Sequence, residues 1–148
     1  MWLNPDRRYT VLTRRRRFGV SLPSGMAEEL DALAARLRTD RSRLVEHAVA
    51  SFLNEYKHYL YDHECSGVMI ISGSFDRGRV ASILDEYKDI ILSTTHIHVN
   101  GLCTEIVVVQ GSSGKIAEMH TKLSSVRGCN VRYIPFSTVN KTVEVNTE

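Results

Sequence analysis

The sequence lacks any long apolar run: no stretch approaches the 18 or more residues that a membrane-spanning helix requires. We therefore expect no membrane partner. The first 20 residues also lack the apolar core and following small residues of a secretory signal peptide, which argues against export. With 43% hydrophobic and 24% charged residues, the composition is that of a globular protein, which we expect in the cytoplasm.

Cysteine is scarce, with only three residues, Cys65, Cys103 and Cys129. An odd number cannot pair completely within one chain, so a full disulfide framework is excluded. In a reducing compartment such cysteines are core thiols or metal ligands. The cysteine count therefore agrees with a cytoplasmic protein.

Acidic residues are nearly absent from the front of the chain. Residues 1–17 contain six arginines and one aspartate, whereas the remainder contains 13 basic and 16 acidic residues. A solvated tail would account for an arginine run, but such a run also suits phosphate. We define residues 1–16 as a basic N-terminal arm and expect it to contact phosphates or a minor groove, adding salt-dependent affinity.

The next segment alternates in polarity and is followed by two helical patterns. Residues 17–22 place Phe18, Val20 and Leu22 on one face of a predicted strand and Arg17, Gly19 and Ser21 on the other. Pro23 and Ser24 begin a helix with one apolar stripe, Met26, Leu30, Leu33 and Leu37. A second helix is predicted over residues 41–60, capped by Thr39 or Asp40, with inward-facing Val45, Val49, Phe52, Tyr56 and Tyr59.

One strand and two short helices cannot satisfy the strand edge or bury both stripes, so this unit is expected to pair with a copy of itself. Over residues 18–60 the pattern resembles the ribbon-helix-helix family, whose paired strands enter the DNA major groove. The resemblance implies a DNA-binding domain at 17–62 that binds a double-stranded operator, with base contacts from Arg17, Gly19 and Ser21. Glycine departs from the usual polar residue, so Arg17 and Ser21 are expected to matter more. The start of the second helix, Arg41 and Ser42, is expected to hold a phosphate.

The rest of the chain predicts the order βαββαβ, that is, a ferredoxin-like arrangement and an α+β protein overall. The predicted strands cover residues 67–75, 93–99, 102–110 and 130–136, and the predicted helices cover residues 76–91 and 114–127. Each helix carries an apolar stripe. We assign this domain to residues 63–138 and a C-terminal tail to residues 139–148.

Asn100-Gly101 between two alternating segments predicts a two-residue hairpin turn. That register places His96, His98, Cys103 and Glu105 on one face, where two imidazoles and a thiolate can converge on one ion. Glu105 is expected to orient a ligand from behind. For any one of these residues alone, a structural role is favoured: His96 and His98 would line a polar sheet face and Cys103 would be a buried core thiol. Their combination favours a metal site.

A His-x-His pair followed closely by cysteine, behind a ribbon-helix-helix segment, resembles the nickel-responsive regulator (NikR) family from Arg17 to about Phe136. The resemblance implies an ACT-type regulatory domain that forms a tetramer core, a dimer of dimers, with nickel in a roughly square-planar site at its interface. Three ligands map onto His96, His98 and Cys103. The fourth, a histidine of a neighbouring subunit in the family, maps by spacing onto Asp85, with Glu86 as a substitute.

Two departures from the family bear on the metal. The carboxylate at Asp85 favours Zn(II) or Co(II), and the segment between His98 and Cys103 is one residue shorter than in well-known members. Ni(II) is favoured by resemblance, and imidazole and thiolate ligands also suit Cu(II). The predicted function is a metal-responsive transcriptional regulator rather than an enzyme, in which the ion favours the arrangement that spaces the paired ribbons for their half-sites.

Two other interpretations stay open. Two histidines and a cysteine with a free fourth position are typical of a hydrolytic metalloenzyme, and an ACT-type domain is also typical of a sensor of a small organic ligand. Outside the hairpin, His63 and Cys65 form a weaker candidate pair of ligands, while His58 and His120 are predicted to lie on solvent-exposed helix surfaces.

Overall fold

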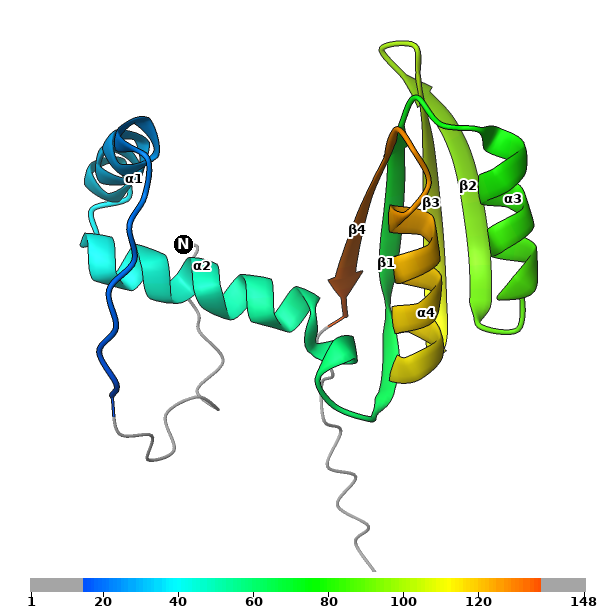
Figure 1. Cartoon of the computed structure of the whole chain (residues 1–148), viewed down its shortest axis with the longest axis horizontal. Helices are drawn as coiled ribbons and strands as arrows, with labels where there is room; N and C mark the ends of the chain where they lie inside the picture. Colours follow the sequence, from blue (N-terminus) through cyan, green and yellow to red (C-terminus); the bar gives the residue numbers. More distant parts are fainter. Residues whose placement is uncertain (1–14, 137–148) are drawn as a thin grey trace, which may run out of the picture. The chain divides into compact units, whose positions relative to one another are not determined.

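The computed structural model describes residues 15–136, and its contacts divide the chain into two compact units, residues 1–44 and 45–148. Helix α2 (Arg41–Glu55) is continuous across this division (Figure 1). The basic arm falls almost entirely outside the described residues, as does the predicted C-terminal tail. None of the described helices is both long enough and apolar enough to cross a membrane.

The first unit contains an extended segment, residues 15–23, helix α1 (Ser24–Arg36) and the start of α2. The strand predicted over residues 17–22 is extended but not hydrogen-bonded to another strand in the single chain, and its pairing with the same segment of a second copy stays a prediction. The cap predicted at Asp40 is confirmed, since its Oδ1 accepts a hydrogen bond of 2.8 Å from the backbone N–H of Arg43.

The apolar stripes predicted on the two helices are largely exposed in the single chain. Phe18 is 80% and Phe52 is 59% exposed, and Ala34 is the one residue of α1 and α2 that is buried. A set of apolar side chains of this extent, left in water, favours association with a second protein surface. Pairing of this unit with a copy of itself therefore stays a prediction, and the exposed apolar surface supports it.

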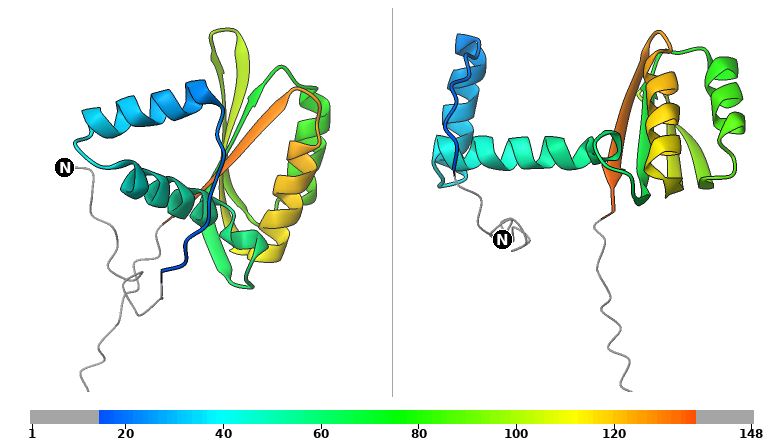
Figure 2. Two further views of the ribbon diagram at one scale, coloured as in Figure 1. Left: turned by 60° about the vertical axis from the view of Figure 1, so that its left-hand side comes forward. Right: turned by 60° about the horizontal axis from the view of Figure 1, so that its bottom comes forward.

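The second unit contains a four-stranded antiparallel sheet with the order β2-β3-β1-β4. Its elements follow the predicted order βαββαβ: β1 (Glu64–Gly73), α3 (Arg77–Glu86), β2 (Ile91–Val99), β3 (Leu102–Ser112), α4 (Ser113–Ser124) and β4 (Cys129–Pro135). Both helices lie against the same face of the sheet (Figure 2). The α+β class and the ferredoxin-like order are confirmed.

The core of this unit lies between the sheet and the two helices. Strand alternation turns Met69, Ile71 and Val107 to the helices, and all three are 0% exposed. The stripes predicted on the helices supply the other half of the core, including Val80, Ile83, Ile116, Met119 and Leu123. Burial of apolar surface on this scale is the dominant stabilising term of the fold.

The opposite face of the sheet is also apolar but only partly covered. Val68, Ile70, Ile106 and Val108 occupy alternate positions of the central strands and are half-buried, and Ile134 on β4 is 45% exposed. An antiparallel sheet with a solvated outer face would carry polar residues there. This open face is therefore suited to packing against another protein surface.

The second helix is shorter than predicted. It ends at Glu55, and Tyr56, with φ −104° and ψ 10°, leads into a 3-10 helix, η2 (Lys57–Tyr59). The prediction that His58 and His120 are solvent-exposed was wrong, because they are only 3% and 4% exposed. The change of helix type turns His58 inward, where η2 packs on α4 and covers His120.

Candidate metal centre

The β2–β3 hairpin is built by its turn. Asn100 and Gly101 have φ of 51° and 78°, the positive values that a two-residue type I′ turn needs at both positions. The observed register is the predicted one, since His96 pairs with Glu105 and His98 pairs with Cys103. All four side chains therefore share one face of the ribbon, and the hairpin extends past the ends of α3 and α4 (Figure 1).

Three donors converge on that face. One ligand atom from each of His96, His98 and Cys103 lies within 4.8 Å of the others. The Cys103 Sγ atom is 3.5 Å from Nε2 of His98 and 3.9 Å from Nε2 of His96. The two imidazole rings stand nearly perpendicular, with centroids 4.8 Å apart. In the described part of the chain, this is the one group of three or more potential ligand residues with such spacing.

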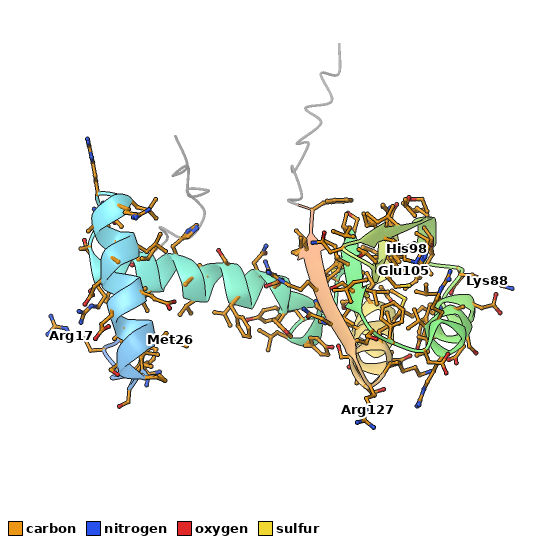
Figure 3. The ribbon with its side chains drawn as sticks, turned by 90° about the horizontal axis from the view of Figure 1, so that it is seen from above. Arg17, Met26, Lys88, His98, Glu105 and Arg127 are labelled. Atoms are coloured by element: carbon orange, nitrogen blue, oxygen red, sulfur yellow. The ribbon has the colours of Figure 1, made fainter. Side chains whose placement is uncertain are left out.

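Glu105 fixes the orientation of His96. Its Oε1 atom lies 2.6 Å from Nδ1 of the imidazole, and both side chains are mostly buried, with exposures of 15% and 26%. A carboxylate that holds one ring nitrogen leaves the other free to bind a metal, as in the carboxylate-histidine-metal arrangement. Figure 3 labels Glu105 and His98, which both belong to this hairpin.

The donor set fits a borderline transition-metal ion. Two imidazole nitrogens and one thiolate are the ligands that Zn(II), Co(II), Ni(II) and Cu(II) take, whereas Mg(II) and Ca(II) prefer oxygen. His98 is exposed and the other two ligands are half-buried, so the centre is open on one side. Three protein ligands with an open side leave room for a fourth group from water or from another subunit.

The fourth predicted ligand does not reach this centre within one chain. Asp85 lies on α3 with 79% of its side chain exposed, and Lys88 is its partner at 3.9 Å. The substitute Glu86 accepts a hydrogen bond of 2.6 Å from Lys122. The structure therefore brings together His96, His98 and Cys103, and it leaves Asp85 on the surface.

The predicted DNA contacts are exposed in the first unit. Arg17, Gly19 and Ser21 all lie in the extended segment, and Gly19 has open space around it. Ser42 lies in the first turn of α2. Arg41 makes a bidentate pair with Asp31, both contacts being 2.6 Å. At this helix start the Arg41 guanidinium is therefore already paired with a carboxylate, and the Arg43 N–H is held by the Asp40 cap, so the predicted phosphate contact stays a prediction.

The second pair considered from the sequence, His63 and Cys65, has a structural role here. Cys65 Sγ lies 2.6 Å from Nε2 of His63, whose Nδ1 lies 2.7 Å from the carbonyl oxygen of Tyr61. Burial raises the pKa of the Cys65 thiol above its usual range, which disfavours the thiolate that a metal needs. Both ring nitrogens of His63 are occupied, so the pair lacks the open geometry of the hairpin centre.

Comparison with known families gives two matches that together cover residues 14–138. Residues 14–57 match the ribbon-helix-helix domain, and residues 57–138 match the NikR C-terminal nickel-binding domain. A curated relative from Saccharolobus islandicus is 31% identical over 124 residues, which cover 76% of this chain and 86% of the relative. It is named "Putative nickel-responsive regulator", and so is a relative from Pyrococcus horikoshii, which is 30% identical over 118 residues with the same coverage.

Two solved structures are similar to part of this chain. An uncharacterized protein from Thermotoga maritima is 16% identical, with a TM-score of 0.47, and the alignment covers 50% of this chain and 99% of that one. The ACT domain from a GTP pyrophosphokinase of Chlorobium tepidum is 17% identical, with a TM-score of 0.40, and the alignment covers 49% of this chain and 100% of that one.

Proposed function

The chain belongs to the nickel-responsive regulator family, and from that premise we propose that it is a transcriptional regulator whose affinity for a DNA operator depends on an ion held by His96, His98 and Cys103. The observation that carries the proposal is the convergence of these three donors behind a DNA-binding segment. Residues 17–62 read the DNA and residues 63–138 sense the metal. The basic arm adds phosphate contacts beside the operator.

Nickel is the first candidate for the ion because the matched relatives are named for it. The fourth ligand gives this chain a reason to prefer a different metal ion from the family, since Asp85 supplies an oxygen donor where the family supplies a nitrogen donor. Oxygen in that position favours tetrahedral Zn(II) or Co(II) over planar Ni(II) or Cu(II). Asp85 is exposed, so it is available to a centre on a neighbouring subunit.

Two exposed apolar surfaces support a homo-oligomer. The stripes of α1 and α2, with Phe18 and Val20, support pairing of the DNA-binding units, and the open face of the sheet supports a second, separate contact between regulatory domains. Two different self-complementary surfaces on one chain generate a dimer of dimers. The proposed assembly is therefore a tetramer with two DNA-binding ribbons.

In this assembly His96, His98 and Cys103 of one subunit, with Asp85 of a neighbour, would hold the ion, and these ligands would be brought together in only one arrangement of the regulatory domains, so that binding would shift the population toward that arrangement. That arrangement spaces the two ribbons for their half-sites, where Arg17 and Ser21 contact base edges and the start of α2 contacts phosphate. Metal affinity and operator affinity are then linked by one coupling free energy.

The same geometry favours a regulatory centre over a catalytic one. A hydrolytic metal site needs a general base beside its activated water. In the described part of the hairpin face the one carboxylate is Glu105, and His96 already occupies it at 2.6 Å. Glu105 is thus committed to orienting a ligand.

The test uses the full-length chain and random-sequence DNA duplexes, from which a binding sequence is selected with Ni(II)-loaded protein. Affinity for that duplex is then measured for the demetallated protein and after adding Ni(II), Co(II), Zn(II) or Cu(II) separately. We expect at least one ion to raise affinity by 10-fold or more, and His98→Ala to abolish the rise. His47→Ala, which removes an exposed histidine far along the sequence from the hairpin, is the control and should behave like the parent protein.

Equal affinity with and without every ion would overturn the metal dependence while leaving DNA binding intact. If an amino acid then changed operator binding of the demetallated protein, the chain would instead be a sensor of an organic ligand.

A further inference from the structure

A buried pair of histidines joins η2 to α4, away from the metal centre. Nε2 of His58 lies 3.1 Å from Nδ1 of His120, and the two residues are 3% and 4% exposed. Tyr59 in η2 also contacts α4, with its hydroxyl 3.0 Å from that of Thr121. The sequence placed both histidines at the surface, so this contact is a feature that the structure alone reveals.

The surroundings of the pair are mainly aromatic. The His58 ring meets Tyr133 edge-on at 4.7 Å and Tyr59 at 4.5 Å, and the His120 ring lies 5.7 Å from Tyr56. These rings come from the α2–η2 junction, η2 and β4, so the pair lies where these segments meet α4. Such an environment removes water from both imidazoles and penalises a charge on either.

We propose that the His58–His120 contact is an acid-sensitive link that holds η2, and with it the C-terminal end of α2, on the regulatory domain. With both rings neutral, one nitrogen donates and the other accepts across the 3.1 Å contact. With both rings protonated, two N–H groups and two positive charges would face each other in an aromatic pocket. Protonation therefore favours release of η2 into water.

The charged and titratable groups around the pair do not reverse this effect. Burial lowers the pKa of His58 from 6.5 to about 4, with smaller contributions from His120 and His63, and the Glu55 backbone opposes it weakly. Burial also lowers the pKa of His120, against opposing contributions from Glu55 and the Val131 backbone. The Glu55 carboxylate is already paired with Arg132 at 2.7 Å. On the β1 side, burial raises the pKa of Cys65, which leaves this thiol neutral.

The direction of the pH effect follows from these shifts. A histidine whose pKa is lower in the closed state than in water stabilises the closed state above pH 6.5, and this stabilisation is lost as the pH falls. The pKa of His58 changes from about 4 in the closed state to 6.5 in the open state. This change alone raises the equilibrium constant for opening about 30-fold between pH 7.5 and pH 5.0. The helix that begins with Arg41 and Ser42 would thereby lose its attachment at the other end.

The test is hydrogen–deuterium exchange of the full-length chain at pH 7.5 and pH 5.0, corrected for the intrinsic exchange rate. A chelator is present, so that protonation of the metal ligands has no ion to release. We expect exchange of residues 56–61 to rise about 30-fold at pH 5.0 while the central strands β1 and β3 stay protected. His58→Phe, which keeps an aromatic ring, should remove most of the pH dependence. His120→Gln, which keeps a hydrogen-bonding group and leaves His58 buried, should reduce it only in part, because burial is the largest cause of the lowered pKa of His58.

The matched control is His47→Gln, an exposed histidine on α2, which should keep the parent response. Unchanged exchange of residues 56–61 in the parent protein at pH 5.0 would overturn the proposal, even if a variant failed to fold. So would a response in His58→Phe equal to that of the parent. The readout uses neither metal nor DNA, so its failure is distinct from failure of the proposed regulatory function.

Discussion

Glu105 lies directly across the β2–β3 ribbon from His96, with its carboxylate 2.6 Å from Nδ1 of the imidazole. This pairing decides which nitrogen of His96 is available to an ion, because a ring held at Nδ1 presents Nε2 to the side where Cys103 lies. The centre therefore depends on a residue that need not touch the metal.

Glu105→Gln should weaken metal binding without abolishing it. The amide keeps the shape of the carboxylate but supplies no charge to hold the imidazole N–H, and loss of such a partner costs about 10- to 100-fold in metal affinity. Titration of the demetallated protein with Ni(II) or Zn(II) against a competing chelator measures the change. Glu118→Gln on α4 is the control; if it weakened binding equally, a general charge effect would replace the positioning role.

Asp85 should contribute to metal binding only between subunits. We expect Asp85→Asn to weaken binding by the assembled protein, because an amide oxygen is a poorer ligand than a carboxylate, and Asp85→His to shift preference toward Ni(II). Competition titrations with Ni(II) and Zn(II) give the ratio of affinities for each variant. Asp62→Asn provides an exposed carboxylate outside α3 as a control. A ratio that Asp85→His leaves unchanged would remove this residue from the ligand set.

The hairpin could be predicted because its determinants are local. Asn100 and Gly101 fix the turn, the turn fixes the register, and strand alternation then sorts His96, His98 and Cys103 to one face. The strands and helices of the second unit follow from apolar periodicity in the same way. No long-range information was needed for either.

His58 was mispredicted because its environment is set by tertiary packing. An unbroken helix to Leu60 would have placed it outward, but α2 ends at Glu55 and the chain tightens into η2. His120 follows Met119, one of the core residues of α4, and is buried where it meets His58 of η2. A histidine pair 62 residues apart leaves no periodic signal in the sequence.

Arg17 should combine general phosphate attraction with base recognition, and the two can be separated. Arg17→Ala should lose about 1 to 3 kcal/mol of operator binding, since a bidentate arginine–guanine contact is worth that much. Arg17→Lys keeps the positive charge but loses the bidentate hydrogen bonding of the guanidinium group. It should therefore retain the salt dependence of binding while losing preference for the operator over unrelated DNA. Binding measured at several salt concentrations on both duplexes gives the two quantities, and a full-affinity, fully selective lysine variant would contradict base readout at this position.

Gly101 should be needed for its backbone conformation rather than for space. A Cβ atom at Gly101 would meet nothing within 4 Å, but its φ of 78° is unfavourable for a residue with a side chain. We expect Gly101→Ala to lower the free energy of unfolding by about 1 to 2 kcal/mol. Metal affinity should fall with it, because the turn positions the donors.

Gly25 is the matched control: it also has open space, but it lies in the first turn of α1, where alanine is neutral or stabilising by up to about 1 kcal/mol. Urea unfolding of the demetallated proteins, followed by circular dichroism, compares the two variants. Equal effects would mean that the left-handed turn does not carry strain, and the hairpin would then need another explanation for its register.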